Sequence, residues 1–74
     1  MDRKSVRSSN VSSIGYDPER HVLEVEYKSG GVYRYFSVSP DEFHNIESAE
    51  SVGKAIAMIK KSKAYGKAGE GDLA

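Results

Sequence analysis

The chain contains no cysteine, no tryptophan and no apolar stretch long enough to cross a membrane. Without cysteine, neither a disulfide nor a zinc–thiolate centre can stabilise the fold. Because its N-terminal residues also lack the apolar run of a signal peptide, we expect a cytoplasmic protein without membrane contacts. The 74 residues, of which 38% are hydrophobic, are enough for a single domain with a thin core.

Residues typical of catalytic and metal sites are equally scarce. His21 is expected in a strand beside a turn and His44 in an acidic helix, and neither has a nucleophile or a second metal ligand at a suitable spacing. Gly30-Gly31 is not a phosphate loop, because no helix and no Gly-Lys-Ser/Thr sequence follow it. We therefore expect no catalytic residue, no metal and no cofactor.

Charge is balanced over the whole chain but unevenly distributed along it. Residues 17–50 carry eight acids and three bases, whereas residues 51–67 carry five lysines and no acid. A lysine-rich segment attracts anionic partners. It also interacts favourably with the dipole at the carboxyl end of its own helix. Either effect would account for the lysines, so both explanations stay open.

Three stretches predict an antiparallel meander, because they alternate apolar with polar residues or are rich in strand-forming side chains. The turn at residues 17–20 begins with Asp-Pro, as type I turns commonly do. It would place Tyr16 opposite His21. The predicted strands are residues 11–16, 21–27 and 32–38.

The turn between the second and third strands allows two registers. A loop at residues 29–31 pairs Tyr27 with Tyr33, and puts Arg34 beside Glu26 on the solvent face. A loop one residue shorter moves the tyrosines to the solvent face instead, since side chains alternate between the two faces. We favour the first register, because an unpaired charge in the core costs several kcal/mol.

Two helices are predicted after the third strand. Residues 39–42, Ser-Pro-Asp-Glu, match a capping box with proline at the first helical position. A second helix should begin near Ser51 and stop at Gly66. Its apolar stripe consists of Val52, Ala55, Ile56 and Ile59.

Together these patterns predict an α+β domain over residues 10–65. It is a three-stranded antiparallel meander followed by two short helices packed on one face. Residues 1–9 are expected to form a disordered basic tail and residues 66–74 a second disordered tail, because neither segment has a periodic apolar pattern.

The order and spacing of several short motifs resemble the KTSC domain, a module found at the C-terminus of some lysyl-tRNA synthetases and as stand-alone bacterial proteins. The resemblance covers residues 9–65. Members often carry an aromatic residue just after the Gly-Lys step, where this chain has Ala55-Ile56. The function of the family is unknown, and the synthetase context implies RNA binding. The motifs are Ile14-Gly15-Tyr16-Asp17, Leu23-Glu24-Val25-Glu26-Tyr27, Gly30-Gly31-Val32-Tyr33-Arg34-Tyr35 and Ser51-x-Gly53-Lys54.

Nucleic-acid binding is the sharpest functional hypothesis, with single-stranded RNA or tRNA as the partner. Tyr33 and Tyr35 would stack on bases, unless both tyrosines belong to the core. The phosphates would be held by Arg34, Lys54, Lys60 and Lys61.

A protein-interaction module is the alternative function. A partner strand, or a second copy of this chain, would pair with an open edge of the sheet. Val32 and Phe36 would then form an exposed apolar patch on the outer face. Neither hypothesis involves catalysis.

Overall fold

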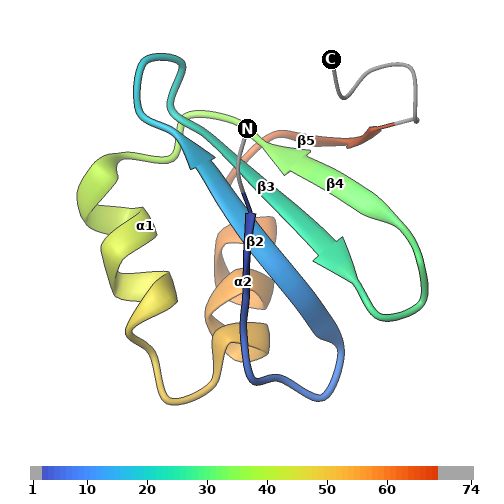
Figure 1. Ribbon diagram of the computed structural model, residues 1–74. Coiled ribbons are helices and arrows are strands. Elements are labelled where there is room, and N and C mark those ends of the chain that lie inside the picture. Colours follow the sequence, from blue (N-terminus) through green and yellow to red (C-terminus); the bar gives the residue numbers. More distant parts are fainter. Residues whose placement is uncertain (1–2, 69–74) are drawn as a thin grey trace.

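The computed structural model describes residues 3–68, which form one five-stranded antiparallel sheet and two helices. The strands lie in the sheet in the order of the chain, and Figure 1 shows α2 behind the sheet with α1 beside it. The predicted α+β class is confirmed, although the sheet has five strands rather than three. The elements are β1 (Arg3–Ser5), β2 (Val11–Asp17), β3 (Val22–Tyr27), β4 (Val32–Tyr35), α1 (Pro40–Glu47), α2 (Val52–Lys60) and β5 (Tyr65–Ala68).

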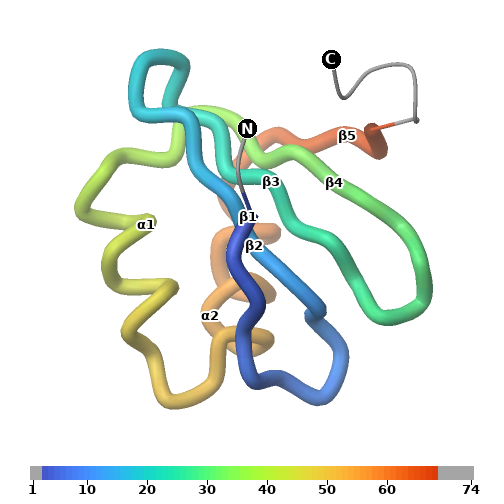
Figure 2. Tube along the Cα trace, viewed as in Figure 1, coloured from blue at the N-terminus to red at the C-terminus, as the bar shows by residue number. Residues whose placement is uncertain are grey.

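The two additional strands come from the segments that we predicted to be disordered. β1 lies within residues 1–9 and pairs with β2, and most of β5 lies within residues 66–74 and pairs with β4. Figure 2 shows these segments at opposite edges of the sheet. The expectation of tails was wrong here, because short polar strands gain their stability from pairing with an existing sheet. Gly66, the predicted helix stop, lies within β5. Residues 1–2 and 69–74 lie outside the described residues.

In the first hairpin, formed by β2 and β3, the side chains lie on the predicted faces of the sheet, but the residues that pair across the strands differ from the prediction. Tyr16 lies opposite Leu23 rather than His21, because the loop covers residues 18–21. His21 has a φ of 56°, and its carbonyl accepts a hydrogen bond from the Val38 N–H at 2.9 Å. The shift of two residues leaves Tyr16 on the predicted face, since the side-chain period of a strand is two.

Neither predicted register of the second hairpin occurs. Tyr33 lies opposite Val25, and Arg34 lies opposite Glu24. The loop ends at Gly30, whose φ of 105° suits glycine. The favoured register is therefore wrong by two residues. Its assignment of faces is right, because a shift of two positions moves no side chain to the other face.

Both helix starts occur as predicted. The Ser39 hydroxyl accepts from the Glu42 N–H at 3.1 Å, and the Glu42 carboxylate accepts from the Ser39 N–H at 3.0 Å, with Pro40 at the first helical turn. The Ser51 hydroxyl accepts from the Lys54 N–H at 3.3 Å at the start of α2. These side chains satisfy backbone donors that have no partner within the helix.

The core lies between the sheet and the two helices. Tyr35 is the largest fully buried side chain. The predicted stripe of α2 is confirmed, since Val52 and Ile56 are buried and Ala55 and Ile59 pack against the core. The buried apolar residues are Val11, Ile14, Leu23, Val25, Tyr35, Val38, Ile46, Val52 and Ile56.

Gly53, at the start of α2, lies against the turn between β1 and β2. A Cβ atom at this position would lie 2.6 Å from the Asn10 Oδ1 and 3.2 Å from the Ser8 Oγ. The Ser8 hydroxyl donates to the Asn10 Oδ1 at 3.0 Å and accepts from the Val11 N–H at 3.3 Å. Glycine in the Ser51-x-Gly53-Lys54 step is therefore explained by close approach of the turn to the helix.

We expect Gly53→Ala to destabilise the protein, and the same change to be stabilising when Asn10 is already alanine. Alanine gains up to about 1 kcal/mol of helix propensity over glycine, but the native Asn10 side chain would have to move away and lose its bond to Ser8. Urea unfolding of the four proteins of this double-mutant cycle measures the coupling. Equal effects of Gly53→Ala in both backgrounds would contradict the expectation.

Glu42 connects the start of α1 to the segment before β5. Its carboxylate accepts from the Ser39 N–H and from the Lys63 ammonium, the latter at 3.1 Å, and Lys63 also donates to the Ser37 carbonyl at 2.8 Å. The bond from the Ser39 backbone, followed by the bond from Lys63, lowers the pKa of Glu42 below its ordinary value of 4.5.

A lowered pKa in the folded state means that ionised Glu42 stabilises the protein above its unfolded pKa. This contribution is lost as the pH falls through the lower folded value. We expect Glu42→Gln, which keeps a capping acceptor, to cost about 0.5 kcal/mol near neutral pH, the scale of an exposed ion pair. The difference from the parent protein should shrink as the pH falls through the lowered pKa of folded Glu42 and vanish below it. Urea unfolding across this pH range is the measurement, and a difference that does not change with pH would show that the charge is unimportant.

Candidate functional site

Four tyrosines gather on the core face of β3, β4 and β5. The ring centroids of Tyr27 and Tyr33 lie 5.5 Å apart in an edge contact, those of Tyr33 and Tyr65 lie 6.2 Å apart, and those of Tyr35 and Tyr65 lie 5.4 Å apart. Alternation along each strand places Tyr27, Tyr33 and Tyr35 on one face, and β5 brings Tyr65 opposite Tyr35. We refer to these four residues as the tyrosine cluster.

A hollow of about 200 Å³ opens beside this cluster. The Lys60 Nζ lies 5.3 Å from the centroid of the Tyr65 ring, within the range of a cation–π contact. Within residues 3–68, the side chains that line the hollow include no carboxylate, and they present aromatic surface, hydroxyl groups and one ammonium group. We refer to it as the tyrosine hollow. Its lining residues are Tyr27, Ser29, Tyr33, Tyr35 and Lys60.

The hydroxyl groups of Tyr27 and Tyr35 lie 2.6 Å apart in a hydrogen bond. Burial raises the pKa of the Tyr35 phenol well above its ordinary value of 10.0, and the hydrogen bond with Tyr27 raises it further. Tyr35 is therefore neutral at physiological pH. A bound anion would meet no negative charge from this phenol.

The structure separates the three central residues of the predicted nucleic-acid site. Tyr33 is partly exposed and lines the tyrosine hollow. Tyr35 has 0% exposure, so it has no free face on which a base could stack, and the core alternative is the right one for this residue. Arg34 points to the opposite face of the sheet, away from both tyrosines.

Only one of the three predicted lysines lines the hollow. This lysine is Lys60, in the last turn of α2. Lys61 follows it at the end of the helix and is exposed. Lys54 is also exposed but begins the helix, about 9 Å away along its axis at 1.5 Å per residue. The structure thus does not gather the predicted lysines at one point.

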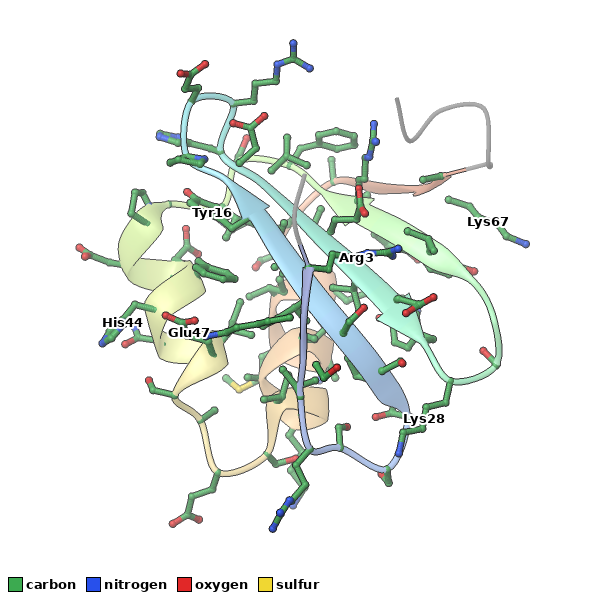
Figure 3. The ribbon with its side chains drawn as sticks, in the orientation of Figure 1. Arg3, Tyr16, Lys28, His44, Glu47 and Lys67 are labelled. Carbon is green, nitrogen blue, oxygen red and sulfur yellow. The ribbon has the colours of Figure 1, made fainter. Side chains whose placement is uncertain are left out.

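Two residues near the hollow were not among the predicted site residues. Tyr65 contacts two members of the tyrosine cluster, and Lys67 lies opposite Tyr33 in the pairing of β4 with β5. In Figure 3 the Lys67 side chain extends away from the edge of the sheet. Tyr65 and Lys67 are two residues apart, the spacing of side chains on one face of a strand. This was the available signal for β5, but a pattern this short does not distinguish a strand from a tail.

The opposite face of the sheet carries a row of paired charges. The Arg3 Nε lies 3.4 Å from one carboxylate oxygen of Glu24, and the Arg34 Nε lies 3.3 Å from the other. The row crosses β2 at Gly15, which lies opposite both Arg3 and Glu24 and has no side chain to separate them. Glu24 is only 3% exposed. Arg34 therefore has an acidic neighbour, as predicted, but that neighbour is Glu24 rather than Glu26.

Two further features of the described residues bear on function. Within residues 3–68, no group of three or more histidine or acidic side chains is arranged to hold a metal ion. In the same part of the chain, neither helix has the length and apolar character needed to cross a membrane.

Comparison with known proteins gives a consistent family. Residues 7–62 match the model of the KTSC domain. An uncharacterized protein of Stutzerimonas stutzeri is 40% identical over 65 residues, which cover 88% of this chain and 92% of the relative. A lysine–tRNA ligase of Nostoc punctiforme is 31% identical over 55 residues, which cover 74% of this chain but only 10% of the ligase.

A solved structure is also similar. The crystal structure of a KTSC domain protein from Yersinia pestis matches with a TM-score of 0.87 and 36% sequence identity, covering 92% of this chain and 97% of that one. The residues matched by the family model run from β2 to α2, and both edge strands lie outside them. The meander and helices predicted from the sequence are thus the part that the family model describes.

Proposed function

The chain belongs to the KTSC domain family, and on this basis we propose that it is a small non-catalytic module that binds single-stranded RNA, including unpaired segments of tRNA, in the cytoplasm. The observation that carries the proposal is the tyrosine hollow, where aromatic rings lie beside a lysine and the described lining residues include no carboxylate. The similarity to a segment of a lysine–tRNA ligase supports the choice of RNA as the partner.

Ring surface is provided in this proposal by Tyr33, which lines the tyrosine hollow, and by Tyr65, which lies beside it. Tyr65 is 45% exposed, whereas Tyr35 is buried. Stacking of a base on an aromatic side chain contributes about 1–3 kcal/mol in single-strand binding. Lys60 places a positive charge beside the Tyr65 ring for a phosphate. Arg34 and Lys54 are not included, because they lie on the other face and at the far end of α2.

The proposal predicts that Tyr65→Ala weakens RNA binding by about 5-fold to 100-fold, the equivalent of one lost stacking contact. Fluorescence anisotropy with a short mixed-sequence RNA at low salt measures the affinity. Phe36→Ala is the matched control, since Phe36 is 42% exposed, close to the 45% of Tyr65, but takes no part in the ring contacts of the tyrosine cluster. An equal loss in both variants would contradict the proposed site.

Two lysines of α2 provide a second comparison, based on charge. Lys60→Gln should weaken binding, while Lys54→Gln, which removes the same charge from the first turn of α2, should have little effect. Amide shifts during the titration should concentrate on β4, β5 and the end of α2. Without localised shifts there, the RNA proposal fails.

Docking of a protein partner or of a second copy of this chain is the second candidate function. The outer strands of the predicted meander are both paired, β2 with β1 and β4 with β5, so strand addition at an open edge would have to use β1 or β5. Phe36 provides exposed apolar surface that favours this candidate. Salt separates the two functions, because RNA binding weakens steeply with salt whereas strand addition depends mainly on backbone hydrogen bonds.

A further inference from the structure

The spacing of the aromatic rings limits how a base can enter the tyrosine hollow. The centroids of Tyr27 and Tyr33, which both line the hollow, lie 5.5 Å apart with their rings at 82°. Those of Tyr33 and Tyr65, which lies beside the hollow, are 6.2 Å apart with the rings tilted by 56°. A base held between two rings needs about 7 Å, twice the contact distance of about 3.5 Å between carbon atoms. In this arrangement a base therefore lies against a ring and not between two rings.

Tyr27 and Tyr35 add polar groups to the hollow. Tyr35 has no exposed ring, and its hydroxyl is bonded to that of Tyr27. The Tyr27 ring meets the Tyr33 ring edge-on, at 82°, so these two rings do not form one flat surface. A pair of hydroxyl groups uses one of its two protons in this bond, and the remaining proton can be donated to a ligand. The hollow thus combines aromatic surface with hydroxyl donors at its wall.

The charges that line the hollow match a single phosphate. Among the described residues that line it, Lys60 is the one cation and none is acidic. Arg34, which was also predicted to hold phosphates, lies on the opposite face of the sheet with Glu24. Within residues 3–68, the lining therefore lets one negative charge be neutralised at Lys60 without a competing carboxylate.

We propose that the tyrosine hollow holds one nucleotide unit, with its base against the tyrosine cluster and its phosphate at Lys60. The ring spacings leave no place for a base between two rings, and the hollow has a volume of only about 200 Å³. The module would accordingly recognise a single unpaired nucleotide, and not a run of bases. This inference rests on the proposed function and specifies its ligand.

Length and salt dependence of binding test this inference. We expect the 5′-monophosphates AMP and UMP to bind nearly as tightly as a mixed-sequence RNA decamer, once the number of equivalent positions on the decamer is taken into account. For the decamer, the logarithm of the binding constant plotted against the logarithm of the salt concentration should have a slope of about −0.7, the value for one phosphate of a single strand.

The contribution of Lys60 is tested with the same probes. Adenosine, which lacks the phosphate, should bind more weakly than AMP, and Lys60→Gln should remove this difference. Lys54→Gln should preserve it. If adenosine and AMP bind the parent protein equally, the assignment of the phosphate to Lys60 is overturned.

The failures of the two proposals are distinguishable. One contrary result is a decamer that binds over about 100-fold more tightly than AMP after correction for its number of equivalent positions, with a salt slope steeper than about −2. This result overturns the single-nucleotide inference and leaves RNA binding in place. Absence of binding to every RNA tested overturns the proposed function itself. Mononucleotide binding that neither Tyr65→Ala nor Lys60→Gln changes places the site elsewhere and overturns both.

Discussion

Replacing Tyr35 with alanine is expected to unfold the domain or to remove most of its stability. Tyr35 is the largest fully buried side chain, with 0% exposure. Truncation of a buried aromatic residue costs about 3–5 kcal/mol, and a domain of this size rarely has more than about 3–5 kcal/mol in total. Urea unfolding followed by circular dichroism measures the change.

Tyr33→Ala is the matched control, because Tyr33 lies on the same strand and the same face but is partly exposed. We expect it to remain folded. Tyr35→Phe should cost only about 1 kcal/mol, since it removes one hydroxyl and leaves that of Tyr27 without its partner. A Tyr35→Ala protein with a normal unfolding midpoint would show that this ring is not part of the core.

This result also bears on how binding data should be interpreted. If Tyr35→Ala unfolds the protein, its loss of RNA affinity carries no information about contact with RNA. Tyr65 is the informative residue, because it is exposed and lies on an edge strand. Tyr33 and Tyr35 therefore both line the hollow, but Tyr33 is partly exposed whereas Tyr35 belongs to the core.

Glu24→Gln is expected to destabilise the protein by about 2 kcal/mol. Breaking a fully buried ion pair from one side costs about 3–5 kcal/mol. The expected value is lower here because the side chains of Arg3 and Arg34 are 25% and 26% exposed. The Arg3 Nη1 is buried without a hydrogen-bond partner, so Arg3 depends strongly on its contact with Glu24. Urea unfolding gives the magnitude.

Hydrogen exchange should show where this stability is lost. Since Arg3 is in β1, the variant should exchange faster at the pairing of β1 with β2. Glu26→Gln is the control on the same strand and face, where the side chain accepts one hydrogen bond from the Ser13 hydroxyl at 3.0 Å. We expect it to cost less than about 1 kcal/mol. Equal losses from both changes would show that the charge row has no special role.

The features predicted correctly from the sequence are local ones. The capping box at Ser39 depends on residues within one turn of a helix. The apolar stripe of α2 follows from a period of 3.6 residues. The faces of β3 and β4 follow from a period of two, which is why Tyr33 and Arg34 were assigned to the right sides although their partners were wrong. The resemblance to the KTSC domain rested on the same short-range patterns.

The pairing of the strands and the composition of the site were decided by tertiary structure. A shift of two residues keeps every side chain on its face, so periodicity alone cannot distinguish between such registers. β1 and β5 are short and polar, and they form because the sheet offers them unpaired edges. Tyr65 joined the cluster by this route, and Glu24 met Arg3 across β2 in the same way. Sequence determined the local elements and their faces, because these depend on neighbouring residues. Only the folded sheet determined which residues from distant segments meet.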